Sequence, residues 1–208
     1  MKQLLSILIA AAIAGAGALL YAWSGVYDIA ATTPHWALTT SFIDMLKERS
    51  IEGHSGGIQA PNSDDPNLRE ASLPHYHEMC RRCHGAPGQA PEEFSKGLYP
   101  APPSMVSGHI QEELSTAEVY WVIKHGIKMT GMPAFGPTHS EDILWGLTAL
   151  ATEMPRMRPD QYRQQIETAG SAERTAHGHS HGGSNVDADP DHGGHKHTGN
   201  SDAVETHD

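Results

Sequence analysis

The longest apolar run of the chain lies at its N-terminus, where residues 4–23 contain no charged side chain and follow Lys2. A helix of about 20 apolar residues spans the ~30 Å hydrocarbon core of a bilayer. Small residues inside the run would also suit signal-peptide cleavage, but the run continues past them to Tyr21 and Trp23, which are typical of a membrane interface. We therefore predict residues 1–24 to be a retained single-pass anchor (or uncleaved signal) of the cell inner membrane, with the remainder on the periplasmic side.

Residues 25–67 combine an amphipathic stretch with a polar linker. Between residues 34 and 52 apolar positions recur at helical spacing beside charged ones, and Gly53 ends the pattern. We expect a juxtamembrane helix there, which either packs on the following domain or lies on the lipid surface. The glycine, proline and aspartate residues that follow are typical of a linker.

Residues 68–158 carry the helical patterns of a small domain. A capping box at residues 115–118 precedes the apolar positions of one helix, which we expect to end at Gly126. Ser140 begins another helix, whose apolar residues keep helical spacing until Pro155. Loops rich in glycine and proline lie between these stretches, and an all-α fold is expected.

Residues 159–208 form the last region, in which apolar residues are few and histidine alternates with glycine and aspartate, as in the run at 177–183. Such a segment lacks the apolar surface for a core, so we predict a disordered His-rich tail. Imidazoles at this spacing suit borderline cations, which makes a divalent transition metal (Cu²⁺, Ni²⁺ or Zn²⁺) a candidate partner. The alternative is a solvated polar extension.

The only two cysteines of the 208 residues lie in one motif, Cys80-Arg81-Arg82-Cys83-His84. On one helical turn both thiols can add to haem vinyl groups, and His84 then lies beneath the iron as proximal ligand. A thioredoxin-like pair or half of a zinc site are the alternatives, but no βαβ pattern and no second cysteine pair accompany the motif. It therefore favours one covalent haem c held by Cys80, Cys83 and His84.

A second axial ligand for the iron is expected from the loop Gly131-Met132-Pro133, where glycine admits close approach of the backbone and proline stiffens the turn. Met132 is the predicted ligand. Met129 is its rival, but we assign it to the end of the preceding helix as a core residue. Further candidates are Met79, Met105, Met154 and, in the absence of Met132, His125.

Two further contacts are expected around the haem. A carbonyl of the loop at residues 85–91 can accept the Nδ1–H of His84, so that Nε2 faces the iron. The proline-rich stretch at residues 97–103 walls one haem edge, and its Tyr99 either reaches a propionate or simply packs.

The C-x-x-C-H motif, the stretch Trp121–Ile127 and the Gly-Met-Pro loop together resemble a membrane-anchored class I cytochrome c over about residues 68–156. The resemblance implies a small helical domain wrapped around one haem. In this family an aromatic residue, here Tyr76, precedes the first cysteine by four positions. A small residue four positions earlier, here Ser72 rather than glycine, lets the first and last helices cross. We expect Pro74 to mark the first turn of a shortened first helix.

The net charge of −11 argues against nucleic acid as a partner and favours weak, salt-sensitive docking on basic surfaces. No catalytic triad, carboxylate pair or phosphate loop is visible, so an enzyme is not expected. The expected function is electron transfer, with one electron carried on the haem between periplasmic or membrane redox proteins. The alternatives are a metal-handling protein, whose tail binds Cu, Ni or Zn with the haem as redox sensor or oxidant, and a peroxidase-like enzyme with an open sixth position.

Overall fold

The regular elements of this chain are helical throughout the part that its computed structural model describes, residues 1–61 and 65–177. The α-helices are α1 (Lys2–Trp23), α2 (Ala37–Ser55), α3 (Pro66–His75), α4 (Arg81–His84), α5 (His109–Glu113), α6 (Thr116–His125), α7 (Glu141–Glu153) and α8 (Pro159–His177). A π-helical turn η1 (Tyr76–Cys80) and two 3₁₀ turns, η2 (Glu93–Gly97) and η3 (Met154–Arg156), complete the set. The all-α expectation is confirmed.

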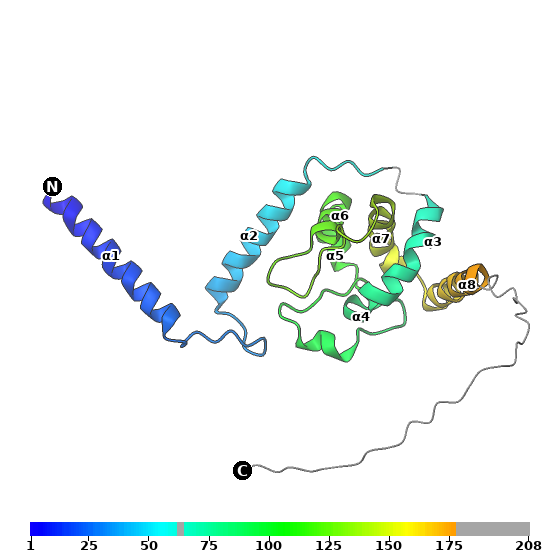
Figure 1. The fold of residues 1–208 in the computed structure, drawn as a ribbon, viewed down its shortest axis with the longest axis horizontal. Helices are drawn as coiled ribbons and strands as arrows, with labels where there is room; N and C mark the ends of the chain where they lie inside the picture. The colour runs from blue at the N-terminus through cyan, green and yellow to red at the C-terminus, as the bar shows by residue number, and fades with distance from the viewer. Residues whose placement is uncertain (62–64, 178–208) are drawn as a thin grey trace, which may run out of the picture.

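Helix α1 stands apart from the rest of the molecule, as Figure 1 shows. None of its residues is buried, although its sequence is almost entirely apolar. It is the one helix among the described residues that is long and apolar enough to cross a membrane. These properties suit a membrane anchor.

Helices α3 and α7 make the closest crossing in the domain. A Cβ placed on Gly146 of α7 would lie 2.0 Å from the Ser72 hydroxyl oxygen and 2.4 Å from the Leu68 carbonyl oxygen. Ser72 is fully buried, and its hydroxyl donates to the carbonyl of Ile143 at 3.2 Å. The expected position of Ser72 at a close helix crossing is therefore confirmed, with a glycine facing it.

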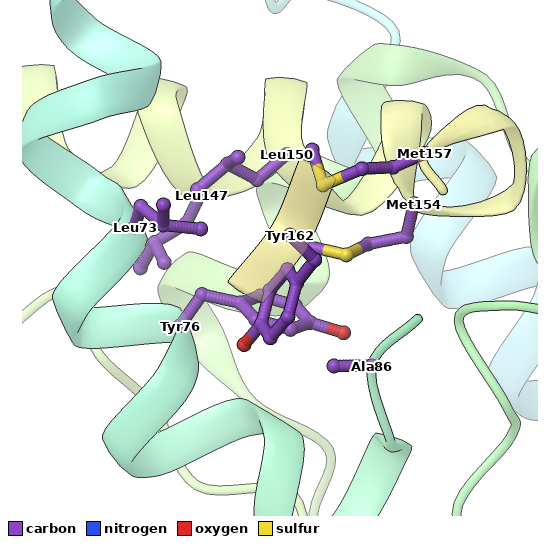
Figure 2. Packing of buried hydrophobic residues seen from close by; sticks show 8 residues of the cluster. All are labelled: Leu73, Tyr76, Ala86, Leu147, Leu150, Met154, Met157 and Tyr162. Atoms are coloured by element: carbon purple, nitrogen blue, oxygen red, sulfur yellow. The ribbon is translucent and has the colours of Figure 1, made fainter. Parts of the chain in front are cut away.

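The main hydrophobic core lies beside this crossing and joins α3, η1, α7, η3 and α8 (Figure 2). Its buried members are Leu73, Tyr76, Ala86, Leu147, Leu150, Met154, Met157 and Tyr162. Met154 is fully enclosed in this cluster, which identifies it as a core residue.

Pro74 lies near the end of α3 and not in its first turn, so the expectation of a shortened helix is wrong. The helix begins at Pro66, where the Asp65 carboxylate accepts the backbone N–H of Asn67 at 2.9 Å. Proline has no N–H to donate and its ring crowds the preceding turn. The chain relaxes into the π-helical turn η1 directly after Pro74, and the added residue of such a turn changes the direction of the side chains that follow.

The folded part of the chain continues beyond residue 158, so the prediction of a disordered tail from residue 159 is wrong for residues 159–177. Helix α8 places Tyr162 fully inside the core and packs Ile166 against it. The segment is polar overall, but these two apolar residues are four apart and share one helix face. The rest of the predicted tail, including its metal-binding candidates, lies outside the described residues.

We expect Gly146→Ala to lower the free energy of unfolding by about 2–3 kcal/mol, because the added methyl group overlaps backbone and side-chain atoms of α3. Gly53→Ala on α2 is the matched control, since nothing lies within 4 Å of its added Cβ. The control should be neutral or stabilising by up to about 1 kcal/mol. Chemical denaturation followed by circular dichroism in detergent measures both. Equal effects of the two changes would contradict the crossing.

Tyr162→Ala should lower the free energy of unfolding by about 3–5 kcal/mol, because it leaves a cavity in the core. Tyr162→Phe keeps the ring and removes only the contact of the hydroxyl with His77 Nδ1 at 2.9 Å, so about 1 kcal/mol is expected. The same denaturation experiment tests the pair. A neutral Tyr162→Ala would show that α8 does not belong to the folded domain.

Candidate functional site

A large cavity of about 680 Å³ opens between α2, α6 and the loops that precede and follow α6. Its walls are mainly apolar, and the aliphatic side chains that line it include Ile51, Leu98, Ile110, Leu114, Val119, Val122, Ile123 and Ile127. The volume is within the range of about 300–1,000 Å³ in which proteins bind small molecules and cofactors. Cys83, His84 and Met132 all line it.

His84 is held in one orientation by a backbone carbonyl. Its Nδ1 lies 2.7 Å from the carbonyl oxygen of Pro103, which can only accept, so Nδ1 carries the proton and Nε2 keeps its lone pair. Burial lowers the pKa of His84, which favours the neutral ring that a metal requires. The expected acceptor in the loop at 85–91 is corrected to Pro103, in the proline-rich stretch. A ring fixed in this way suits an axial ligand.

The turn that carries His84 is fixed on its core side by Tyr76. The buried Tyr76 hydroxyl donates to the carbonyl of Gly85 at 2.9 Å. Burial raises the pKa of Tyr76 well above its usual range, so the hydroxyl stays a donor. The aromatic residue four positions before the first cysteine therefore packs in the core and positions the residue after the histidine.

The two arginines between the cysteines share one carboxylate. Arg81 Nη2 and Arg82 Nε each lie 3.0 Å from an oxygen of Glu92, and the Glu92 N–H donates to the carbonyl of Arg82. The hydrogen bond from Arg82, followed by the contribution of Arg81, holds the pKa of Glu92 below its usual range. The loop after His84 is thereby closed back onto the motif.

The two thiols differ in their surroundings. Cys83 lines the cavity, whereas Cys80 packs against the hydrophobic core and does not line it. Burial raises the pKa of Cys80 to about 12 and also raises the pKa of Cys83. Both are free thiols; Cys83 lies in α4, which ends at His84, and Cys80 is the last residue of η1, directly before α4.

The two rival methionines point in different directions. Met132 lines the cavity with His84, whereas Met129 is 98% exposed. Met129 also lies outside α6, in a left-handed backbone conformation, so its assignment to the end of a helix is wrong. Met105 lines the cavity as well, but its backbone N–H donates to the carbonyl of His84, which ties it to the histidine side. His125 is exposed at the end of α6 and does not line the cavity.

The loop that carries Met132 is packed tightly on the end of α6. Gly126 ends that helix with a φ of +65°, and a Cβ there would lie 2.7 Å from the Pro133 carbonyl carbon. The N–H groups of Phe135 and Gly136 donate to carbonyls of the last turn of α6. The Met132 backbone therefore has a defined position, as the Gly-Met-Pro pattern predicted.

Helix α2 supplies a wall of the cavity that the sequence did not reveal. Lys47, Glu48, Ile51 and Glu52 line the cavity, and Ile51 is only 5% exposed. The amphipathic pattern indicated a packed helix, but nothing in it distinguished the cavity from any other apolar surface.

Tyr99 does not face the cavity. Its hydroxyl accepts the backbone N–H of His35 at 3.2 Å, and the two rings meet edge to face. Of the two expectations for Tyr99, contact with a propionate is not supported and packing is. Its neighbours Leu98, Pro100 and Pro102 do line the cavity, in agreement with the expected wall.

Residues 70–150 match the family model of cytochrome C oxidase, cbb3-type, subunit III. The matched segment lies within the expected span of residues 68–156 and contains the C-x-x-C-H motif, α6 and the methionine loop. Neither the curated proteins nor the solved structures contain a match to this chain.

The cofactor of this family is a covalently bound c-type haem, and the residues present fit it. The cavity has the required apolar walls, the imidazole of His84 with its Nε2 unprotonated, the thioether of Met132 and Cys83 among its lining residues. Helix α2, which supplies one wall of the cavity, lies outside the matched segment.

Ile51→Ala should weaken the packing of α2 on the domain, because the loss of a buried isoleucine side chain lowers stability by about 2–5 kcal/mol. Each 1.4 kcal/mol raises the equilibrium constant for the opening of α2 by about a factor of ten. Trypsin cleavage of the detergent-solubilised chain after Lys47 and Arg49 should accelerate at least about tenfold. Ser41→Ala, an exposed polar position of the same helix, is the control and should leave the rate unchanged. Equal rates in the two variants would exclude the packing role of Ile51.

Proposed function

We propose that this chain, in which residues 70–150 form a c-type cytochrome domain, is a membrane-anchored carrier of single electrons on one covalent haem. The observation that carries the proposal is that His84 and Met132 line the same apolar cavity while Nδ1 of His84 is engaged by Pro103. An oriented imidazole and a thioether are the ligand pair of electron-transferring c-type haems.

The proposed attachment uses both cysteines of the motif. Cys80 and Cys83 would form the thioether bonds, His84 would be the proximal ligand and Met132 the sixth ligand. The position of Cys83 at the cavity supports this, as does the position of Cys80 directly before α4, the turn that carries Cys83 and His84. The exposure of Met129 supports Met132 over its neighbour.

The chain's own contribution to electron transfer is to hold the ligands still and to exclude water. The bound haem supplies the one-electron change at its iron. Pro103 keeps the proton on Nδ1 of His84, and the tightly packed loop keeps Met132 in place in both oxidation states. A thioether ligand and a dry, apolar pocket both favour the reduced form and raise the potential.

We place the domain on the periplasmic side of the inner membrane, with α1 as the anchor. The support is the apolar, unburied α1 and the single Lys2 that precedes its apolar run. Periplasmic or membrane redox proteins are the proposed partners. No observation favours the metal-handling alternative, because no cluster of three potential ligand side chains occurs in the described residues and the His-rich run lies outside them.

Met132→Ala should abolish the near-infrared band of methionine–iron(III) ligation and lower the reduction potential by about 0.1 V or more, a fraction of the ~0.8 V over which axial ligands set haem potentials. Met129→Leu is the control and should change neither, because Met129 points into solvent. Absorption spectroscopy and redox titration measure both. A band lost in the control instead would reverse the ligand assignment.

Replacement of both Cys80 and Cys83 by alanine should leave the haem extractable by acid acetone, because no thioether bond can form. The domain should also lose stability, since the haem fills the cavity. Haem that resists extraction from the double variant would overturn the proposed attachment.

A further inference from the structure

Helix α2 has two opposite faces of different character. One face carries the buried Ile51 and Ser55, and Ile51 lines the cavity. At 3.6 residues per turn the opposite face presents Leu38, Phe42, Met45 and Leu46, whose exposed fractions lie between 48% and 83%. That face carries no charge before Arg49. A contiguous apolar face of this kind on a folded domain indicates a binding surface.

The start of this face is tied to the end of α1. The ring of Trp36, directly before α2, lies 6.3 Å from that of Tyr21 and 5.8 Å from that of Tyr27. The Tyr27 hydroxyl lies 2.7 Å from Nδ1 of His35. In Figure 1 α2 lies between α1 and the helices of the domain. A helix that begins beside the end of a membrane span, with aromatic residues at the junction, starts at the level of the lipid headgroups.

We propose that α2 is an interfacial helix, whose outer face (Leu38, Phe42, Met45 and Leu46) is embedded in the surface of the bilayer that α1 crosses. Amphipathic helices bind in this way with their apolar side at the boundary of headgroups and acyl chains. The inference rests on the proposed anchoring by α1. Lipid is the occupant because the apolar face is continuous with the anchor through the Tyr21, Tyr27 and Trp36 cluster.

One consequence concerns the orientation of the domain. The inner face of α2 is part of the cavity wall, with Ile51 buried against the domain. An α2 embedded by its outer face therefore turns this wall of the haem cavity toward the membrane. The domain is held at the surface in one orientation and does not tumble on the linker.

The test uses the full haem-loaded chain in phosphatidylcholine nanodiscs, with a single added cysteine that carries a small fluorophore. Phe42→Cys and Leu46→Cys report the outer face, Leu20→Cys reports α1, and Met129→Cys, which is more exposed than any of them and lies in the methionine loop of the domain, is the domain control. For each, the emission in nanodiscs of brominated lipid is divided by that in ordinary lipid. The ratio cancels quenching by the haem.

We expect at least twofold quenching by brominated lipid at positions 20, 42 and 46, and no quenching at 129. Quenching at 20 without quenching at 42 and 46 would overturn the inference and leave the face to a protein partner, while the anchor stands. An unquenched position 20 would overturn the anchor and the inference together. The haem-loaded chain without an added cysteine is treated with the same fluorophore as a further control. Incorporation of the fluorophore there would show that Cys80 or Cys83 is unreacted, which would contradict the proposed attachment independently of the anchor.

Discussion

The close crossing of α3 and α7 is the constraint on which the rest of the domain depends. Because Gly146 has no side chain, Ser72 and the backbone of α3 approach α7 directly. This contact fixes the direction in which α3 delivers η1 and the C-x-x-C-H turn. It also forms one side of the core into which Tyr76 and Tyr162 are packed. The orientation of His84 toward the cavity thus depends on Ser72 and Gly146. Neither residue lines the cavity, and both act through their small size, which allows the two helices to approach.

The features that sequence reasoning predicted were those with a local cause. The capping box at Ser115 forms as expected, and so does the tight loop around Met132, because short-range backbone chemistry dictates both. Tyr76 and Ser72 were placed by resemblance and lie where it implied. Pro74 was misjudged because a π-helical turn depends on the packing around it, which leaves no pattern in the residues themselves.

The contacts that escaped prediction join residues whose spacing follows no local rule, from 10 to 85 positions apart. The acceptor of the His84 Nδ1–H is the carbonyl of Pro103, which no spacing rule identifies. The carboxylate that pairs with both arginines of the motif is that of Glu92. Tyr162 reaches the core from a segment whose average composition is polar. The mean polarity of a segment predicts how much of it is exposed to solvent. A single buried tyrosine can nevertheless attach a mostly polar helix to a core.

The hydrogen bond between His35 and Tyr99 connects the segment between α1 and α2 to the stretch that orients His84. His35 lies two residues before α2, and Tyr99 begins the stretch that ends at Pro103, the residue whose carbonyl orients His84. Prolines make up three of the four residues after Tyr99, so this stretch is a stiff strut. If α1 is held in a bilayer, as proposed, a tilt of the anchor would reach the Nδ1–H···O contact through this stretch. The orientation of His84 as a ligand would then depend on the lipid around α1.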